Sequence, residues 1–395
     1  MTIDLRQQTG NALFFLLILV IMLDPTNTVL HLKDVFFILL VGYNIVCFKP
    51  DWKFLPHICI VFAVVTIGYL MAEVQQNTVD GERLLGVYKS IAPLVLLLWV
   101  RYYDVLRLSV VPAVLTCLLI VVLYVMASAS ESYEYAMYVF FSEHNDMVMM
   151  TQRSFLGIPL FGMYYKSFVS LSFGMYFVFY QSAYACSRWK RVGYWLLSLL
   201  FFVAFLMSGT RGTMLLPFFM VAVVSFSLLK GMGRMRYVLY PLLLLFALFV
   251  VGVILLLASE TEEASNTIKY AHIASYMKLF SDHPLYLLIG QGTATSFYTE
   301  GLRRMMTETE WSYVELVRNY GVLSLLIVAV LLYPLKTLWA QARRDDFAMG
   351  VLATYVAYLL VAGTNPLLFS STGMLMIWIA YSYSEYTAQP LSSHP

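Results

Sequence analysis

Charged residues are scarce in this chain. They make up 12% of its 395 residues, whereas hydrophobic residues make up 61%. A soluble chain of this length could not hide so much apolar surface in its own core, so the composition excludes an ordinary soluble protein and indicates lipid as the solvent. In lipid, only α-helices and closed β-barrels satisfy all backbone groups. Strands of a barrel would alternate polar and apolar residues, and Tyr240–Ala258 is apolar throughout, so we expect helices.

Other signals are missing as well. A net charge of only +2 gives no sign of a nucleic acid partner. The four cysteines lie within apolar runs or at the ends of such runs, where no structural disulfide is expected: Cys47, Cys59, Cys117 and Cys186. No internal repeat is visible. The first apolar run, Ala12–Leu23, lacks a small-x-small cleavage site, so we interpret it as an uncleaved signal anchor.

The apolar runs predict an all-α polytopic membrane protein of about twelve transmembrane helices, forming a single domain over residues 1–395. Several runs are shorter than a perpendicular crossing requires, and the first two are expected to meet in a partly buried bend at Asp24–Thr28. The predicted spans are Asn11–Leu23, His31–Phe48, Phe54–Ala72, Tyr88–Val100, Val105–Ala127, Lys166–Ala185, Gly193–Met207, Met214–Leu229, Tyr237–Ala258, Gly321–Leu335, Phe347–Gly363 and Gly373–Tyr383.

Loops rich in positive charge alternate with loops poor in it, and this pattern predicts the orientation of the helices in the membrane. Five short loops carry the positive charge and are expected to be cytoplasmic, as are both termini. These loops hold Lys49 and Lys53, Arg101 and Arg107, Arg188 to Arg191, Lys230 to Arg236, and Lys336 to Arg344. The outer side then receives Glu73–Arg83, Ser128–Tyr165, the Ser208–Thr213 turn and a long, partly helical loop, residues 259–320, between the ninth and tenth helices.

The tight outer turn Ser208–Thr213 contains a single arginine, Arg211, between small residues. An arginine at a helix end can simply extend its charged head to the interface. Positive charge is disfavoured on the outer side, however, and an ionisable group at membrane depth usually has a partner or ligand. Because the planar guanidinium suits a phosphate group, Arg211 is the first candidate for an anion site.

The long loop carries further candidates. Lys269 and His272 begin an amphipathic stretch at helical spacing. Proline at position 284 should end that helix at the preceding Asp282-His283. The following Gly290-Gln291-Gly292 lacks the third glycine and the βαβ setting of a dinucleotide site, so we expect a tight turn there.

A group of charged residues precedes the tenth predicted helix. If Glu310–Gly321 is helical, Glu310 and Val314 stack at i and i+4, and Glu315 pairs with Arg318 at i and i+3. The pair is either a surface ion pair worth a few tenths of a kcal/mol or leaves Arg318 as a phosphate contact. Glu310 is close in sequence to several arginines and is a candidate general base. Further candidate phosphate contacts are Arg303 and Arg304.

The earlier outer loop, Ser128–Tyr165, has a run, Glu143–Asp146, with three potential metal-binding side chains. Three such groups in four residues cannot all reach one ion from a regular helix, so we expect a solvated polar loop and no metal. Arg153 of the same loop is another candidate phosphate contact. His272 and Tyr313 of the long loop are candidate sugar contacts.

Three features in order resemble the family of O-antigen ligases and Wzy-type O-antigen or capsule polymerases. They are the Ser-x-x-Arg-Gly turn at Ser208–Gly212, the long outer loop with His283-Pro284 and Gly290-Gln291-Gly292, and the helical stretch Trp311–Gly321. The resemblance with usable motifs covers roughly Tyr194–Leu335, and the first half is similar in hydropathy alone. Ligases place a histidine just before the tenth helix, where this chain has Glu310-Trp311, and this departure favours a polymerase.

The resemblance implies an enzyme of the bacterial inner membrane whose site faces the periplasm. Such an enzyme transfers a glycan from undecaprenyl diphosphate to the sugar of another lipid-linked repeat unit, with no cofactor or metal. Its implied partners are the lipid-linked oligosaccharide, membrane lipids and a chain-length regulator. By this resemblance, Arg211 and Lys269 would hold the diphosphate. Our own hypothesis adds that Arg303, Arg304, Arg318 or Arg153 helps them and that Glu310 accepts the acceptor's proton.

Two other functions remain open. A ligase would attach the finished polymer to lipid A-core. A flippase or transporter would need ionisable groups near the middle of the membrane and often has repeated halves, and the predicted spans show almost none of the former and no repeat.

Overall fold

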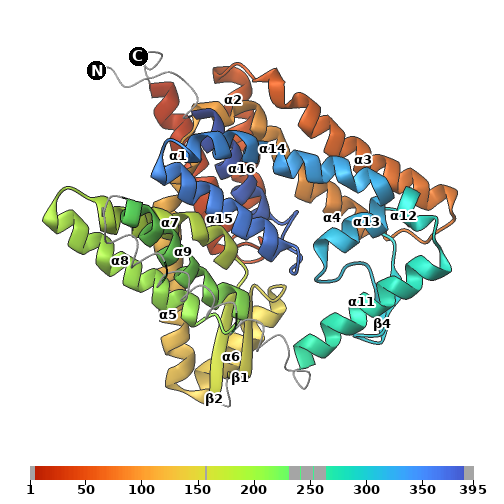
Figure 1. Cartoon of the computed structure of the whole chain (residues 1–395). Helices are drawn as coiled ribbons and strands as arrows, with labels where there is room; N and C mark the ends of the chain where they lie inside the picture. Colours follow the sequence, from red (N-terminus) through yellow and green to blue (C-terminus); the bar gives the residue numbers. More distant parts are fainter. Residues whose placement is uncertain (1–4, 156–157, 231–240, 242–251, 253–263, 387–395) are drawn as a thin grey trace.

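The chain folds into a mostly helical (76%) molecule, seen in a computed structural model that describes residues 5–155, 158–230, 241, 252 and 264–386 (Figure 1). Within these residues, seven helical stretches have the length and apolar composition needed to cross a membrane. They are Leu5–Leu23, Trp52–Val74, Gly81–Tyr102, Val105–Ala129, Arg188–Leu206, Gly212–Leu229 and Ser312–Ala342. These stretches confirm a helical, multi-pass membrane protein in its broad class.

The first half of the chain is helical apart from one hairpin of strands. Its elements are α1 (Leu5–Leu23), α2 (Lys33–Cys47), η1 (Trp52–Phe54), α3 (Leu55–Val74), α4 (Gly81–Ile91), η2 (Ala92–Tyr102), α5 (Val105–Ala129), α6 (Glu131–Glu143), β1 (Val148–Phe155), β2 (Ile158–Tyr165), η3 (Phe168–Leu171), α7 (Ser172–Tyr184), α8 (Arg188–Leu206) and α9 (Arg211–Lys230).

The second half contains the long loop and the last helices. Its elements are α11 (Ala264–Asp282), α12 (Tyr286–Ile289), β3 (Phe297–Thr299), β4 (Arg304–Met306), α13 (Ser312–Tyr320), η5 (Gly321–Leu323), α14 (Ser324–Ala342), α15 (Asp346–Ala362) and α16 (Ser371–Tyr386). Eleven of the twelve predicted spans coincide with a helix. The ninth, Tyr237–Ala258, falls outside the described residues except at positions 241 and 252, so the count of about twelve stays a prediction.

Aspartates define where several helices begin. The side chains of Asp80, Asp104 and Asp345 accept hydrogen bonds from backbone N–H groups in the first turns of α4, α5 and α15, at 3.1, 3.1 and 3.0 Å. Each cap satisfies a donor that the helix itself leaves unpaired. Charged side chains thus mark the ends of apolar helices and leave their middles free to pack.

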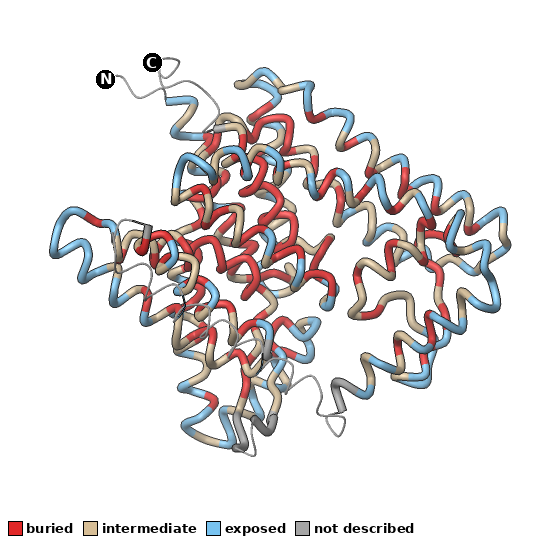
Figure 2. Tube along the Cα trace, in the orientation of Figure 1, coloured by how far each residue is buried: buried red, intermediate tan, exposed pale blue. Residues whose placement is uncertain are grey.

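The core lies where α1, α5, α7, α15 and α16 meet, and its buried residues form the centre of Figure 2. Phe14 packs on Tyr103 and Trp378 with ring centroids 4.9 and 5.6 Å apart. The indole N–H of Trp378 donates to the Pro93 carbonyl at 3.1 Å, and the Tyr103 hydroxyl donates to the Asn44 side chain. The polar tips of these aromatic residues are therefore satisfied inside an apolar core.

Loops lie at two ends of the molecule. At one end, where α1 begins and α16 ends, Lys53 pairs with Glu385 at 2.7 Å and the Tyr43 hydroxyl donates to the Arg6 carbonyl at 2.8 Å (Figure 1). The opposite end holds α6, the β1–β2 hairpin and α11. We call it the outer-loop end, because the loops predicted to lie outside gather there.

The α1–α2 turn at the outer-loop end is the predicted bend. Asp24 is fully buried, and its carboxylate accepts hydrogen bonds from the backbone N–H groups of Thr28, Val29 and Leu30. Burial alone would raise the pKa of this carboxyl, but the three N–H donors outweigh it and the pKa is lowered. The bend is therefore held by a carboxylate that stays charged.

The loop 128–165 is more ordered than the sequence indicated. It contains α6 and an antiparallel hairpin in which Val148 pairs with Tyr165 and Phe155 with Ile158. Gly162 of β2 lies against Gly209, where an added Cβ would come within 2.7 Å of the Gly209 Cα. The Met163 N–H donates to the Met207 carbonyl at 2.9 Å. The hairpin therefore docks on the turn that leads into α9.

The long loop follows its predicted course with one exception. Helix α11 ends at Asp282, before the proline, and Gly290 and Gly292 have φ of +78° and +113°, which confirms a tight turn. The prediction of a helix from Glu310 was wrong, because α13 begins at Ser312. Glu310 therefore precedes the helix and does not stack on a residue four positions later.

The turn after α12 is fixed to α3. The Thr293 hydroxyl donates to the Val65 carbonyl at 2.9 Å, and the Thr293 N–H donates to the Gly68 carbonyl at 3.1 Å. Asn77, just after α3, donates to the Gln291 carbonyl at 2.7 Å. The outer loop is thus anchored to a membrane-spanning helix rather than hanging free.

Candidate functional site

A cavity of about 1330 Å³ opens at the outer-loop end. It is lined by the α1–α2 turn, α4, β1, the turn before α9, α11, the segment before α13 and the α15–α16 connection. Among the described residues, its charged lining side chains are four lysines and four acids: Lys33, Lys89, Lys166, Lys269, Asp34, Asp146, Glu308 and Glu310. These side chains can bind the charged or strongly polar part of a ligand.

Distant parts of the chain close the wall of this cavity. The Ser371 hydroxyl donates to the Pro25 carbonyl at 2.9 Å, which joins the start of α16 to the α1–α2 turn. The Ser312 hydroxyl donates to the Asn365 carbonyl at 2.7 Å, which joins the start of α13 to the α15–α16 connection. The candidate residues before α13 are thereby held against the rest of the site.

The turn around Arg211 forms part of the cavity wall. Thr210, Gly212 and Thr213 all line it, and the Thr210 hydroxyl donates to the Thr213 hydroxyl at 2.6 Å in the first turn of α9. Arg211 itself is the first residue of α9, and its side chain lies outside the described part of the chain. The N-terminus of α9 adds partial positive charge at this wall.

Lys269 and Glu310 meet inside the cavity. The Lys269 Nζ lies 3.0 Å from Glu310 Oε2, and the two side chains are 30% and 44% exposed. The indole N–H of Trp311 donates to the Lys269 carbonyl at 3.2 Å and ties the two segments together. The candidate cation and the candidate base thus neutralise each other here, so an anionic ligand that binds Lys269 would also release the carboxylate.

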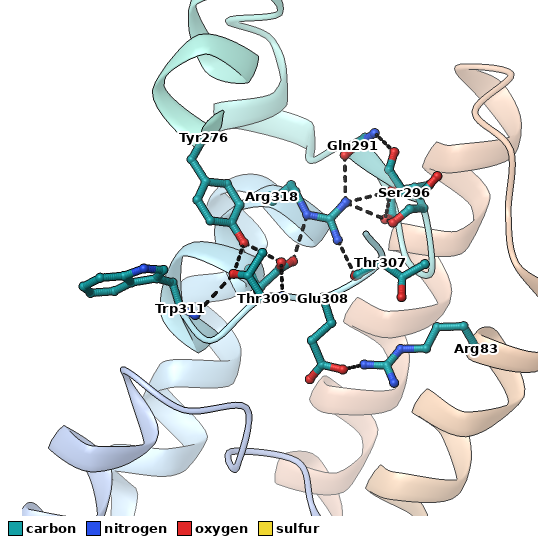
Figure 3. Close-up of polar contacts among 12 residues, drawn as sticks. Arg83, Tyr276, Gln291, Ser296, Thr307, Glu308, Thr309, Trp311 and Arg318 are labelled. Carbon is teal, nitrogen blue, oxygen red and sulfur yellow. Dashed lines mark hydrogen bonds and ion pairs between the residues drawn. The ribbon is translucent and has the colours of Figure 1, made fainter. Parts of the chain in front are cut away.

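Arg318 lies at the centre of a buried network (Figure 3), which we name the Arg318 network after it. Its guanidinium has no exposed surface. It donates to Glu315 Oε2 at 2.8 Å, Gln291 Oε1 at 2.7 Å, the Thr295 hydroxyl and carbonyl at 3.1 Å, and the Thr307 carbonyl at 2.8 Å. The pair with Glu315 is therefore not a surface ion pair, and Arg318 does not line the cavity.

The Arg318 network holds the segment that carries Glu308 and Glu310. Glu315 accepts hydrogen bonds from the Thr309 N–H at 2.9 Å and from the Tyr276 hydroxyl. Glu308 forms an ion pair with Arg83 of α4 (Figure 3). Because Thr307 and Thr309 are both bonded to the network, we assign Arg318 the role of positioning the carboxylates on either side of Thr309.

The two candidate sugar contacts do not line the cavity. His272 is 3% exposed, and neither ring nitrogen has a hydrogen-bond partner. Burial lowers the pKa of this imidazole, although Glu310 and Glu315 partly oppose the effect. The Tyr313 hydroxyl donates to the Leu359 carbonyl at 2.7 Å. Both side chains therefore face the protein interior.

The remaining candidates lie elsewhere on the loops. Arg303, with a φ of +53°, and Arg304 of β4 are exposed, and neither lines the cavity. Arg153 belongs to β1, and its side chain lies outside the described part of the chain. Of the predicted site residues, the structure thus brings Lys269, Glu310 and the flanks of Arg211 to one place.

Three lysines of the cavity were missed by the sequence reasoning: Lys33, Lys89 and Lys166. Each belongs to the outer half of a predicted span or to its outer flank. The rule that drew attention to Arg211, positive charge on the unfavourable side, applied to them as well. Within the described residues, no group of three or more His, Cys, Asp or Glu side chains is placed to hold a metal ion.

No protein-family model, curated protein or solved structure matches this chain.

Proposed function

We propose that this protein is a metal-independent glycosyltransferase of the polysaccharide-polymerase type. It would move a glycan from an undecaprenyl-diphosphate carrier to the acceptor sugar of another lipid-linked repeat unit and release undecaprenyl diphosphate. One observation carries the proposal. Lys269, Glu310 and both neighbours of Arg211 line a single cavity at the outer-loop end. The proposal places that end in the periplasm and both termini in the cytoplasm of a bacterial inner membrane.

The proposed chemistry needs cations and a base, and no nucleotide. The acceptor hydroxyl attacks the anomeric carbon, the bond from this carbon to the diphosphate oxygen breaks, and the diphosphate leaves with the electron pair. Arg211 and Lys269 stabilise the growing negative charge, and a preorganised donor of this kind is typically worth about 3–4 kcal/mol. Glu310 accepts the hydroxyl proton.

The Lys269–Glu310 ion pair is compatible with these two roles, a cation for the diphosphate and a base for the hydroxyl proton. Arrival of the diphosphate at Lys269 competes with the carboxylate for the ammonium, so the base is released when the donor binds. Arg303 and Arg304 stay candidates for outer contacts with the polyanionic substrate because both are exposed. Apolar residues such as Leu17, Phe37 and Trp378 line another part of the same cavity and suit the lipid carrier.

The test is made in a strain that lacks this gene. Arg211→Ala and Arg211→Lys are each expressed there, and surface polysaccharide is resolved by length on a gel. Both should abolish long-chain polymer while the protein stays in the membrane at wild-type levels. Arg188→Ala is the matched control, because Arg188 is an exposed arginine at the start of α8, a cytoplasmic position in the proposed topology. Normal chain length in both Arg211 variants would remove Arg211 from the mechanism.

The deletion strain also separates this proposal from its rivals. Loss of a polymerase leaves a single repeat unit on the lipid A-core, whereas loss of a ligase leaves a bare core. Loss of a flippase traps lipid-linked units on the cytoplasmic face of the membrane. A bare core or trapped units would contradict the polymerase proposal.

A further inference from the structure

Some residues that line the cavity lie on the side of the helices rather than at their ends. Ile38 of α2 and Gly86 and Lys89 of α4 line the cavity and are also exposed at the surface, Ile38 by 67%. A residue that faces both the cavity and the outside marks a rim. The two helices therefore frame an opening between the cavity and the surroundings of the molecule.

This opening lies below the outer ends of its two helices. Helix α2 begins at Lys33, after the α1–α2 turn, and α4 begins at Gly81, just after Val79 pairs with Thr295 of the long loop. Ile38 and Gly86 each lie five residues further along, which is about 7.5 Å at the helical rise. In a membrane-spanning bundle this depth faces lipid, and the neighbouring outward residues Val35 and Leu39 of α2 are 47% and 51% exposed.

An ion pair crosses the opening. Lys89 Nζ of α4 lies 2.6 Å from Asp34 Oδ2 of α2, and both side chains are substantially exposed, by 63% and 42%. The adjacent Lys33 also lines the cavity, and its Nζ donates to the Pro25 carbonyl at 3.3 Å. Two ammonium groups therefore stand beside an opening whose rim on α2, at Ile38, is apolar.

Apolar side chains continue inward from this opening. Phe37 of α2, Leu17 and Ile21 of α1 and Trp378 of α16 line the cavity, which also contains the Lys269–Glu310 pair. A ligand that matches the whole path has an apolar chain at helix depth and an anionic group at the level of the lysines. An isoprenoid diphosphate has this combination, whereas a free sugar or a soluble phosphate ester lacks the chain.

We propose that the gap between α2 and α4 is a lateral portal through which the isoprenoid chain of the lipid-linked substrate enters the cavity from the membrane. Lys89 exchanges Asp34 for a phosphate oxygen as the headgroup passes. The portal rests on the proposed function for the nature of the headgroup, and it adds a binding path formed by residues that the sequence had not singled out.

Gly86 provides a way to close the portal. An added Cβ at Gly86 would meet nothing within 4 Å, so Gly86→Trp fills the opening without a clash at its root. Gly42→Trp is the matched control, because Gly42 is also an exposed helical glycine with nothing within 4 Å, on α2, but it does not line the cavity. Replacing glycine inside a helix does not weaken the helix itself.

The first experiment follows binding alone. The purified full-length protein in lipid nanodiscs is exposed to an isoprenoid diphosphate that carries a photoreactive group at the end of its chain, and the adducts are mapped by mass spectrometry. We expect adducts on peptides of α2 and α4 in the wild type and in Gly42→Trp, and at least a fivefold loss in Gly86→Trp. Adducts confined to other helices, or equal labelling in all three proteins, would overturn the portal.

The second experiment follows transfer with two donors that carry the same glycan. One has a long polyprenyl chain, and the other has a short chain that is soluble in water and can reach the cavity from its outer end. Gly86→Trp should lower turnover of the long-chain donor at least tenfold and that of the short-chain donor less than twofold. Equal loss with both donors would contradict a lateral path.

The two experiments separate the portal from the proposed function. Labelling of α2 and α4 that depends on position 86, without transfer from either donor, would support the portal and reject the glycosyltransferase. Transfer from both donors, with labelling and turnover unaffected in Gly86→Trp, would support the enzyme and reject the portal.

Discussion

Removal of the Arg318 guanidinium should loosen the whole outer loop. In Arg318→Met, the Glu315 carboxylate, which is 8% exposed at its side chain, loses its charged partner. The Gln291 and Thr307 oxygens lose their donors at the same time. No water-exposed position is open to Glu315, because its other oxygen is held by Tyr276 and the Thr309 N–H. The network therefore loses its charge balance in a buried setting.

The magnitude follows from that burial. Breaking a buried ion pair by removing one partner costs about 3–5 kcal/mol, because an uncompensated charge is left behind. Arg318→Lys keeps the charge but cannot reproduce the planar fork that reaches four residues, so we expect an intermediate loss of about 1–3 kcal/mol. Adding Glu315→Gln to Arg318→Met removes the stranded charge and should restore about 2–3 kcal/mol in a double-mutant cycle.

Hydrogen exchange measures this loss where it occurs. Peptides that cover residues 291–318 report the opening free energy of the loop, and every 1.4 kcal/mol corresponds to a factor of ten in exchange. A loss of 3–5 kcal/mol predicts exchange faster by about a hundred- to several-thousand-fold. Arg304→Met serves as the control, because Arg304 is an exposed arginine on the same loop, and it should change exchange less than about threefold.

Two results would refute the reasoning. Unchanged exchange in Arg318→Met would mean that the network does not stabilise the loop. Additive effects of Arg318→Met and Glu315→Gln would mean that the two residues act independently, in spite of the 2.8 Å contact between them.

The positions of the helices could be predicted from hydropathy, because an apolar run of sufficient length has no other way to satisfy its backbone in lipid. The ends of elements in the outer loop also followed from local chemistry. Proline at 284 ended α11, and Gly290 and Gly292 adopted the positive φ that other residues disfavour. These are features that a few neighbouring residues determine by themselves.

The hairpin β1–β2 and the burial of Arg318 depended on distant residues and were therefore not predictable in this way. Gly162 lies in close contact with Gly209, which is forty-seven positions away in the chain. Arg318 and Glu315 were correctly paired by helical spacing, but their burial depends on Gln291 and Tyr276, which a local pattern does not place nearby. Sequence spacing identified the pair and missed its environment.

In the candidate site, too, the sequence identified individual residues and missed how they are arranged. Lys269 and Glu310 were selected separately, one from an amphipathic helix and one from a charged segment, and their ion pair emerges only from the packing of α11 against the segment before α13. The cavity lysine of α4, Lys89, was overlooked because it lies in a stretch that reads as membrane helix. Its role depends on Asp34, in another helix.

Three further changes test other parts of the molecule. Lys269→Met should reduce polymer formation by about a hundredfold, since one preorganised cation is lost. Lys269→Arg keeps the charge and should retain most of the polymer formation. Equal polymer ladders from the two variants would contradict a role for the charge. Gly292→Ala should lower stability by at least about 2 kcal/mol, because φ is +113° and the new methyl would lie 2.4 Å from the Ala72 Cβ. A thermal melt in detergent should show a clearly lower melting temperature for this variant. Gly42→Ala, whose new methyl lies in open space, should leave the melting temperature unchanged. His272 provides the pH dependence: burial lowers the pKa of its imidazole below the usual 6.5. The unfolded chain therefore binds a proton on this residue at a higher pH than the folded chain does, so His272 favours folding above about pH 6.5 and this contribution is lost as the pH falls further. His272→Gln cannot titrate, and the fall in melting temperature between about pH 7.5 and about pH 5.5 should be smaller in this variant than in the wild type. An equal fall in both proteins would mean that the buried ring takes up its proton in the folded state as readily as in the unfolded chain.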